Sequence, residues 1–389
     1  MTRCPVCEGA DLADFVNRSQ VPSHQNLLMP DADAARHIVR GELDMCVCGH
    51  CGFVFNRSFD LAKVSYGPHY DNTQTCSGYF DGYLDGLVAE LVENHGVRDC
   101  TIVEVGCGKG HFLRKLVAYP GSGNRGLGFD PTYVGPDSDL DGRLSFYRRF
   151  YDAQCAEMKA DVVVCRHVIE HVPDPLAILQ AVHAALAGSS KARVYFETPC
   201  VEWILRNKVV WDFFYEHCSL FTENSLGLAF ERTGFTVRRV DHVFGGQYLW
   251  LEAELSGGEA PPSRARPETM AMAKAYAEAE AGLRQRWRDL VEKLGAQGKV
   301  ALWGAGAKGA TLANLIDYDR ALIDCVVDVN PGKQGRYIPG TGHPIVAPDS
   351  LPARGVRSAI LMNPNYRDEN LALLDSAGIA VELIDWSGV

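Results

Sequence analysis

The feature that most constrains the fold is a strand, a glycine-rich turn and a helix in the segment TIVEVGCGKGHFLRKL. The apolar run 102–105, with Glu104 inside it, predicts a short buried strand, and a helix is predicted from about His111. The turn between them holds alternate glycines: Gly106, Gly108 and Gly110. Such glycines let the backbone approach a ligand closely at the start of a helix. The segment therefore predicts a ligand-binding unit of an α/β fold.

Two later segments place polar residues at the ends of further predicted strands. NRGLGFDP predicts a second strand that ends at Asp130, where an acid is placed to bind ribose hydroxyls. ADVVVCRHVIEHVPDP predicts a strand over 162–164 that runs into a polar turn with His167, Glu170 and His171. With the glycine-rich turn, these features are typical of a nucleotide-binding α/β domain.

Five of the thirteen cysteines lie in two short motifs near the N-terminus. CPVC contributes Cys4 and Cys7, and CVCGHCG contributes Cys46, Cys48 and Cys51. Two C-x-x-C pairs separated by a loop indicate a tetrahedral zinc site, and in the second motif only Cys48 with Cys51 has that spacing. We therefore predict a structural zinc on Cys4, Cys7, Cys48 and Cys51, with reduced, unmetallated thiols as the alternative.

The last third of the chain predicts a linker, a long helix and a second glycine-rich turn. Segment 257–268 is rich in Pro, Gly and Ser, as linkers are, and apolar residues from Met272 to Leu294 recur at helical spacing. KVALWGAGAKGATLANLI then has the pattern Gly-x-Gly-x-x-Gly between a strand and a helix: Gly304, Gly306 and Gly309. Asp328 follows about 20 residues later, as in a dinucleotide fingerprint.

Only about 90 residues remain from the second glycine-rich turn onwards, which is short for a full dinucleotide-binding domain. We therefore predict a small Rossmann-like module whose turn shapes the backbone or binds a phosphate. Lys308 lies in this turn, and NPGKQGRYIPG adds Lys333 and Arg336. These three cations are predicted to bind a phosphate of the substrate, and a solvated loop is the alternative for the last two.

Together, EVGCGKG, GFD and RHVIEHVPDP resemble the motifs of a class I S-adenosylmethionine-dependent methyltransferase. The resemblance implies that the first glycine-rich turn and Glu104 hold the amino-acid part of the cofactor and that Asp130 holds the ribose. His167 is then a candidate for orienting the cofactor or the substrate.

The order of zinc motif, methyltransferase motifs and second glycine-rich turn resembles the three-domain sugar C-methyltransferases of deoxysugar biosynthesis, over nearly the whole chain. The resemblance implies an α/β protein with four parts: a zinc-binding domain (1–75), a methyltransferase domain (76–256), a linker with a long helix (257–296) and a C-terminal Rossmann-like domain (297–389). It also implies a nucleotide-linked ketosugar as substrate, with the outer domains closing over it.

The same resemblance implies acid–base chemistry in the segment WDFFYEHCSL. Glu216 and His217 occupy the positions of the family's acid/base pair, whereas Phe214 stands where the family has a tyrosine. His217 is the better base because the ordinary pKa of imidazole is about 6.5. Glu216 is expected to orient the imidazole if the pair lies in a turn. Tyr70 or Tyr79 is expected to supply a hydrogen bond to an oxyanion.

Three functions are compatible with these residues. C-methylation next to a keto group needs a base and a donor to the enolate oxygen. O-methylation of a sugar or natural-product hydroxyl needs only the base, so the missing tyrosine at Phe214 would matter less. A non-catalytic cofactor-binding scaffold is the third. We predict base-assisted C-methylation and retain O-methylation as the main alternative, because the turn GCGKG also departs from the Asn-Asp-Gly type of the family.

The composition fits this prediction. The net charge of −11 gives no overall attraction to nucleic acid or an anionic membrane. No apolar stretch reaches about 18 residues, and MTRCPVC lacks the apolar core of a signal peptide. We therefore expect a cytoplasmic enzyme, acting as a monomer on a small molecule.

Overall fold

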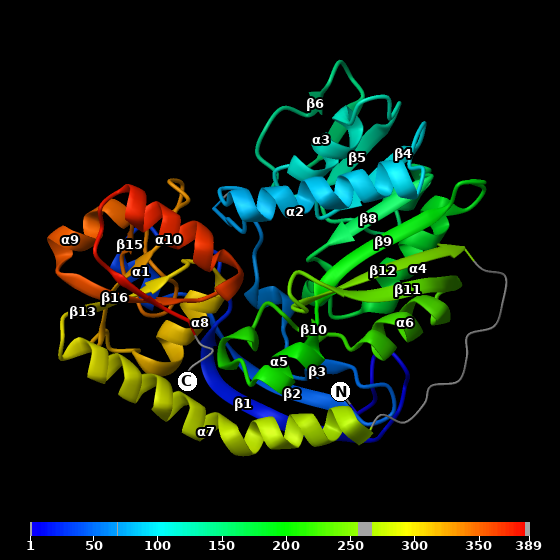
Figure 1. Ribbon diagram of the computed structural model, residues 1–389. Helices are drawn as coiled ribbons and strands as arrows, with labels where there is room; N and C mark the ends of the chain where they lie inside the picture. Colours follow the sequence, from blue (N-terminus) through cyan, green and yellow to red (C-terminus); the bar gives the residue numbers. More distant parts are fainter. Residues whose placement is uncertain (1, 68, 256–266, 386–389) are drawn as a thin grey trace.

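The computed structural model describes residues 2–67, 69–255 and 267–385, arranged around three β-sheets (Figure 1). Most of the predicted linker, residues 257–266, lies outside the described residues. No helix within those three ranges is long and apolar enough to cross a membrane.

The N-terminal sheet is antiparallel and takes its last strand from a distant part of the chain. Its strands, in spatial order, are β1 (Leu12–Pro22), β2 (Arg40–Cys48), β3 (Val54–Asn56) and β10 (Ser219–Leu220). The short helix α1 (Ala32–Arg36) lies between β1 and β2 in the sequence. Ser219 pairs with Phe55, so the segment just after Glu216 and His217 is fixed to the N-terminal sheet.

The central sheet has a doubly wound strand order, which agrees with the predicted α/β class of this domain. Its strands, in chain order, are β4 (Thr101–Val105), β5 (Arg125–Phe129), β6 (Ser138–Asp139), β7 (Leu144–Tyr147), β8 (Val162–Arg166), β9 (Arg193–Pro199), β11 (Phe235–Val243) and β12 (Tyr248–Leu255). The spatial order is β11-β12-β9-β8-β4-β5-β7-β6, and β12 is antiparallel to β9. The order reverses between β4 and β8, and a ligand crevice forms where the carboxyl ends of strands separate at such a point.

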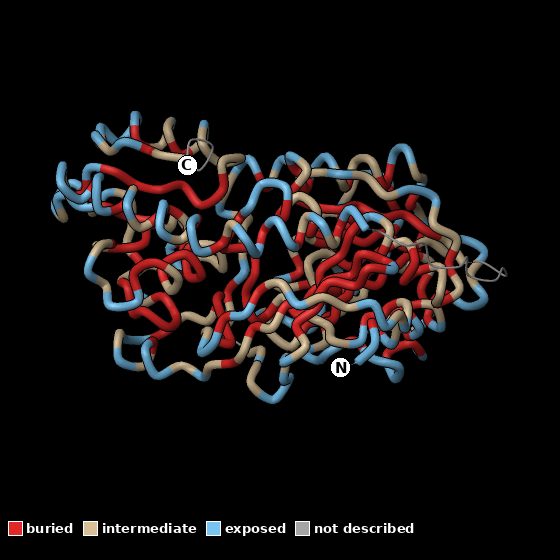
Figure 2. The backbone as a smooth tube through the Cα atoms, turned by 90° about the horizontal axis from the view of Figure 1, so that it is seen from below, coloured by how far each residue is buried: buried red, intermediate tan, exposed pale blue. Residues whose placement is uncertain are grey.

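Helices cover both faces of the central sheet, because alternate strand residues point to opposite sides. Ile102 and Val162 pack in one apolar cluster with α2 (Gly78–Ala89) and α3 (His111–Ala118). Their neighbours Val103 and Val163 pack in another with α4 (Pro175–Leu186) and α6 (Glu223–Arg232). Figure 2 shows that buried backbone runs through the interior and that exposed backbone lies mostly at the periphery. The short helix α5 (Val201–Asn207) follows β9.

The C-terminal sheet is parallel and smaller. Its spatial order is β15 (Ile345–Val346), β14 (Ile323–Val327), β13 (Lys299–Trp303), β16 (Val356–Leu361) and β17 (Glu382–Ile384). Its helices are α8 (Ala307–Ile316), α9 (Leu351–Arg354) and α10 (Arg367–Ser376).

The long helix α7 (Pro267–Gly295) joins the outer sheets and ends where the sequence predicts (Figure 1). It contacts β1 and β2 at one end and β13 and α8 at the other. Glu280 on this helix pairs with the buried Arg18 of β1 at 2.8 Å. Arg18 also donates to the carbonyl oxygens of Val210 and Phe213, so one arginine ties the N-terminal sheet to the WDFF segment.

Candidate active site

The first glycine loop (residues 106–110) follows β4 at the point where the strand order reverses. Gly106, Gly108 and Gly110 have φ values of +69°, +53° and +74°, in the left-handed region that favours glycine. A Cβ atom at Gly106 would lie 2.0 Å from a methyl group of Val168, whereas a Cβ atom at Gly108 would meet nothing within 4 Å. Gly108 therefore borders open space, as expected for a loop that receives a ligand.

Two acids flank this loop. Asp130 directly follows β5, and its Oδ2 accepts a hydrogen bond from the backbone N–H of Gly108 at 2.8 Å. Glu104 is buried in β4, and burial raises the pKa of its carboxyl to about 8. Its Oε2 has no hydrogen-bond partner within the described chain. The open space at Gly108, the unpartnered Oε2 of the buried Glu104 and the acid beside the loop fit the ammonium and hydroxyl groups of S-adenosylmethionine.

His167 follows β8 with a φ of +55° and is held between two carboxylates. Its Nε2 lies 2.7 Å from Glu197 and its Nδ1 3.5 Å from Glu170. Burial opposes the charge, but the hydrogen bonds to Glu170 and Glu197 raise the pKa of His167 to about 9. The predicted orienting residue is thus a fixed imidazolium at neutral pH.

A cavity of about 230 Å³ opens beside His167 and is enclosed by residues of all three parts of the chain. The central part contributes a cluster of histidines and aromatic rings: His167, His171, Phe214, His217 and Tyr248. The N-terminal part contributes Asn26 and residues 72–74. The second glycine loop (residues 304–309) lies across the cavity. The cavity is large enough for a monosaccharide.

The structure separates the two members of the Glu-His pair. Tyr215 and Glu216 form a turn, but the fully buried Glu216 is not among the residues that line the cavity. Its Oε2 accepts from the backbone N–H of Gln25 at 2.7 Å, and its Oε1 lies 3.0 Å from His24 Nδ1. The expectation that Glu216 orients the imidazole of His217 is therefore wrong: this carboxylate holds the N-terminal segment instead.

His217 does line the cavity. Its ring lies 4.0 Å from the Phe214 ring and 4.9 Å from the His171 ring, centroid to centroid. Its Nδ1 has no partner among the described residues. Burial, aided by the nearby charges of His171, His167 and Lys308, lowers the pKa of His217 well below its ordinary value. His217 is thus a neutral imidazole with an unused nitrogen atom in a closed polar cluster.

Neither predicted tyrosine lines the cavity. Tyr79 is 49% exposed and packs against Phe244 and Tyr366. Tyr70 lies nearer to the cavity than Tyr79 does. Its hydroxyl accepts a hydrogen bond at 3.4 Å from Nδ2 of Asn26, which lines the cavity. The exposed position of Tyr79 makes it unsuited to act as an oxyanion donor, because the reacting group would have to lie outside the cavity.

Two of the three predicted cations line the cavity: Lys308, from the second glycine loop, and Lys333, from the segment after β14. Lys308 Nζ lies 2.9 Å from Asp212 and 3.4 Å from Gln247 Oε1, both in the central part of the chain. Lys333 is buried and donates to the carbonyl oxygen of Ala305 at 3.3 Å. Arg336 is exposed and is not among the lining residues, so its predicted contact with the substrate has no support from its position.

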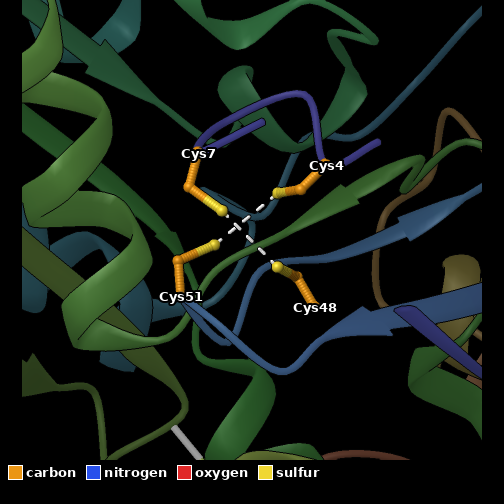
Figure 3. A group of neighbouring side chains, drawn as sticks. All are labelled: Cys4, Cys7, Cys48 and Cys51. Carbon is orange, nitrogen blue, oxygen red and sulfur yellow. Dashed lines mark hydrogen bonds between the residues drawn. The ribbon is translucent and has the colours of Figure 1, made fainter. Parts of the chain in front are cut away.

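The four predicted zinc ligands form one cluster (Figure 3). Cys4 and Cys51 place their sulfur atoms 3.6 Å apart, and Cys7 and Cys48 place theirs 3.5 Å apart. Zn–S bonds of about 2.3 Å in a tetrahedron need sulfur atoms about 3.8 Å apart, so the donor set fits zinc. Cys46 is buried outside this cluster, and its Sγ faces the carbonyl oxygen of Val47, in agreement with the C-x-x-C spacing argument.

Several cavity residues were not predicted from the sequence. Gln247 and Tyr248 follow two glycines with positive φ, Gly245 and Gly246, in the turn between β11 and β12. This Gly-Gly turn is a recognisable hairpin signal, and it places the next residues at the carboxyl edge of the sheet. No local sequence pattern identifies Asp212 as a cavity residue, because its ion-pair partner Lys308 is distant in the sequence.

Comparisons with known proteins agree with this geometry. A methyltransferase domain model matches residues 79–240, and a C-methyltransferase C-terminal domain model matches residues 262–378. C-methyltransferase NovU of Streptomyces niveus is 28% identical over 94% of this chain and 90% of its own length. A ubiquinone biosynthesis O-methyltransferase of Pseudomonas paraeruginosa is 34% identical over 23% of this chain and 41% of that enzyme.

Among solved structures, magnesium protoporphyrin IX methyltransferase from Synechocystis aligns with 46% of this chain and 84% of its own, at 18% identity and a TM-score of 0.36. A TM-score this low does not support a family assignment. The assignment to a family rests on the strand order of the central sheet and on the two domain models. The chain is a class I S-adenosylmethionine-dependent methyltransferase that carries the C-terminal domain of the C-methyltransferases.

Proposed function

We propose that this methyltransferase methylates a sugar carbon next to a keto group and that the sugar is carried by a nucleotide. The observation that carries the proposal is His217, a buried and neutral imidazole with an unused Nδ1 in a cavity of monosaccharide size. The match to a C-methyltransferase over nearly the full length of both chains supports transfer to carbon.

When bound, S-adenosylmethionine supplies an electrophilic methyl group. The residues of this chain have three tasks. The first glycine loop, Glu104 and Asp130 bind the cofactor. His217 takes the proton from the carbon next to the carbonyl, and the C–H electron pair enters the enolate. The polar side chains that line the cavity are held in place by the fold, and preorganised polar groups stabilise developing charge.

The nucleotide is proposed to bind on the side of the second glycine loop. Lys308, in that loop, and Lys333, in the segment after β14, line the cavity, and Gly306 of the loop is the N-cap of α8. A helix N-terminus and ammonium groups both favour a phosphate. A diphosphate at this place would leave the sugar within the histidine cluster.

His217→Ala tests the proposed base. We expect turnover on a nucleoside diphosphate ketosugar to fall by about 10²-fold or more, because a general base contributes that much. The affinity for S-adenosylhomocysteine, measured by calorimetry, should hold. His37→Ala is the matched control, since the His37 side chain is 75% exposed. Equal turnover of His217→Ala and wild type would remove His217 from the mechanism.

O-methylation is the second candidate, favoured by Phe214, which lines the cavity without a hydroxyl group. Solvent exchange separates the two reactions. A C-methyltransferase exchanges the substrate α-proton for deuterium in D₂O with S-adenosylhomocysteine present, whereas an O-methyltransferase leaves that proton in place.

We also propose that the Cys4–Cys7–Cys48–Cys51 cluster binds one structural zinc ion. The cluster has four thiol donors and no open position, so its role would be to hold the N-terminal segment. We expect one zinc ion per chain by emission spectroscopy and loss of zinc in Cys48→Ser. The matched control, Cys46→Ser, should keep it. A folded, active protein without zinc would contradict this proposal.

A further inference from the structure

One tyrosine that lines the cavity, Tyr248, has a hydroxyl group without a hydrogen-bond partner among the residues that the structure describes. The neighbouring tyrosine hydroxyls are engaged with other side chains: Tyr66 with His171, Tyr70 with Asn26 and Tyr366 with Gln74. The hydroxyl of Tyr248 is therefore the one in this group that is available to a ligand without breaking an existing bond.

The ring of Tyr248 is held firmly at the edge of the sheet where the ligand crevice lies. Tyr248 begins β12 and pairs with Pro199, the last residue of β9. Its ring stacks on Phe244 at 5.0 Å and contacts the edge of the His167 ring at 4.4 Å. The residue is 8% exposed, so these contacts fix the ring while the hydroxyl remains at the cavity.

An enolate in this cavity needs a hydrogen-bond donor, and Phe214 cannot provide one. The nitrogen atoms of His167 face Glu197 and Glu170, and Lys308 is bound by Asp212 and Gln247. Burial raises the pKa of Tyr248 well above its ordinary value, so the phenol keeps its proton and remains a donor.

We propose that the hydroxyl of Tyr248 donates a hydrogen bond to the carbonyl oxygen of the bound ketosugar as that oxygen takes up enolate charge. This assignment rests on the proposed function. In the step that it assists, the C–H bond next to the carbonyl breaks and its proton moves to His217. The C–H electron pair forms the C=C bond of the enolate, and the carbonyl π pair moves to the oxygen. The phenol keeps its proton throughout.

The test is deuterium exchange of the substrate α-proton by the full chain in D₂O. Thymidine diphosphate-4-keto-6-deoxyglucose is the first probe in a panel of nucleoside diphosphate ketosugars, and S-adenosylhomocysteine fills the cofactor site. Tyr248→Phe keeps the ring contacts, and we expect it to slow exchange by about 10²-fold, the usual effect of losing one oxyanion donor. The KM of the substrate and the affinity for S-adenosylhomocysteine should change by less than about threefold.

Two further variants make the result specific. Tyr366→Phe is the matched control, since this cavity tyrosine already donates its hydroxyl hydrogen to Gln74 at 3.1 Å. It should retain the wild-type exchange rate. Tyr248→Phe with Phe214→Tyr places a phenol at another position that lines the cavity, and at least about tenfold recovery of exchange is expected if the cavity needs a hydroxyl donor.

Exchange by Tyr248→Phe at the wild-type rate would overturn the role of Tyr248 and leave the proposed function intact. If wild type neither exchanges nor methylates any member of the panel, the proposed function fails, and this inference fails with it. The two failures are thus distinguished by the behaviour of the wild-type protein.

Discussion

The two glycine loops have the same local design and different surroundings. In each, an acid at the end of the next strand accepts a hydrogen bond from a loop N–H: Gly108 donates to Asp130 at 2.8 Å, and Ala305 donates to Asp328 at 2.9 Å. Gly108 faces open space, whereas a Cβ atom at Gly309 would lie 2.1 Å from the Gly304 carbonyl oxygen. The first loop leaves room for a ligand at Gly108, and the second uses Gly309 for close contact between strand and helix.

Each loop also carries a lysine that pairs with an aspartate of another part of the chain. Lys109 pairs with Asp71 at 2.9 Å, and its side chain is 50% exposed. Lys308 pairs with Asp212 at the same distance, but its side chain is 25% exposed. A glycine pattern therefore identifies the backbone shape of a loop, whereas the residues across from the loop set its contacts with the rest of the chain.

The largest expected effect is a loss of ligand affinity on substitution of Gly108 in the first glycine loop by alanine. The left-handed φ of +53° strains any side chain, and the new methyl group would enter the ligand space. We expect the affinity for S-adenosylhomocysteine to fall by roughly 10²-fold. Gly306→Ala is the matched control, because its φ of −104° suits any residue. Equal losses of affinity in both variants, measured by calorimetry, would break the distinction between the loops.

Gly309→Ala tests the packing role in the second loop. Its methyl group would collide with backbone at 2.1 Å, so we expect destabilisation of about 1–3 kcal/mol. Gly227→Ala, in α6 with nothing within 4 Å of its Cβ position, should be neutral or stabilising by about 0.5–1 kcal/mol. Thermal unfolding measures both. A Gly309→Ala protein as stable as wild type would contradict the packing role of Gly309.

Lys308→Met and Lys109→Met compare the contributions of the two lysine–aspartate pairs to the free energy of unfolding. Lys308→Met leaves the mostly buried Asp212 carboxylate without its cation, and we expect a loss of about 1–2 kcal/mol. Lys109→Met removes a more exposed pair and should cost less than about 1 kcal/mol. Denaturant unfolding at low and moderate salt gives both values. A larger cost for Lys109→Met would reverse the assignment of the interdomain role.

The smallest effect is a pH dependence at His167, next to the first loop. Because the folded pKa is raised to about 9 from an unfolded value of about 6.5, the stabilisation is complete below pH 6.5 and is lost as pH rises through 9. The melting temperature of wild type should therefore fall by roughly 2–4 °C more than that of His167→Gln between pH 7 and 9.5. Parallel curves would show that His167 is not held as a cation.

The sequence predicts those parts of the molecule whose determinants are local. Strand, glycine turn and helix follow one another within a few residues, and both C-x-x-C pairs carry their own spacing. The clustering of the two pairs is confirmed, as is the α/β class of the central domain. The domain boundaries and the roles of the site residues stay predictions.

The incorrect and missing predictions concern residues whose contacts are made with residues distant in the sequence. The sequence suggests that Glu216 pairs with its neighbour His217, but its carboxylate binds His24 and Gln25, almost 200 residues earlier in the chain. Tyr248 was missed because QYLWLEAEL has the composition of an ordinary strand, and only the hairpin register brings its first tyrosine to the cavity. The apolar residues around a polar residue can indicate that it is buried, whereas the identity of its hydrogen-bond partner depends on the tertiary fold.

The most direct test of the difference between the two loops is the stoichiometry of S-adenosylhomocysteine binding, measured by calorimetry on wild type, Gly108→Ala and Gly306→Ala. The structure predicts one site per chain, lost in Gly108→Ala and kept in Gly306→Ala. Two sites per chain, or a single site that depends on Gly306 and not on Gly108, would contradict the account.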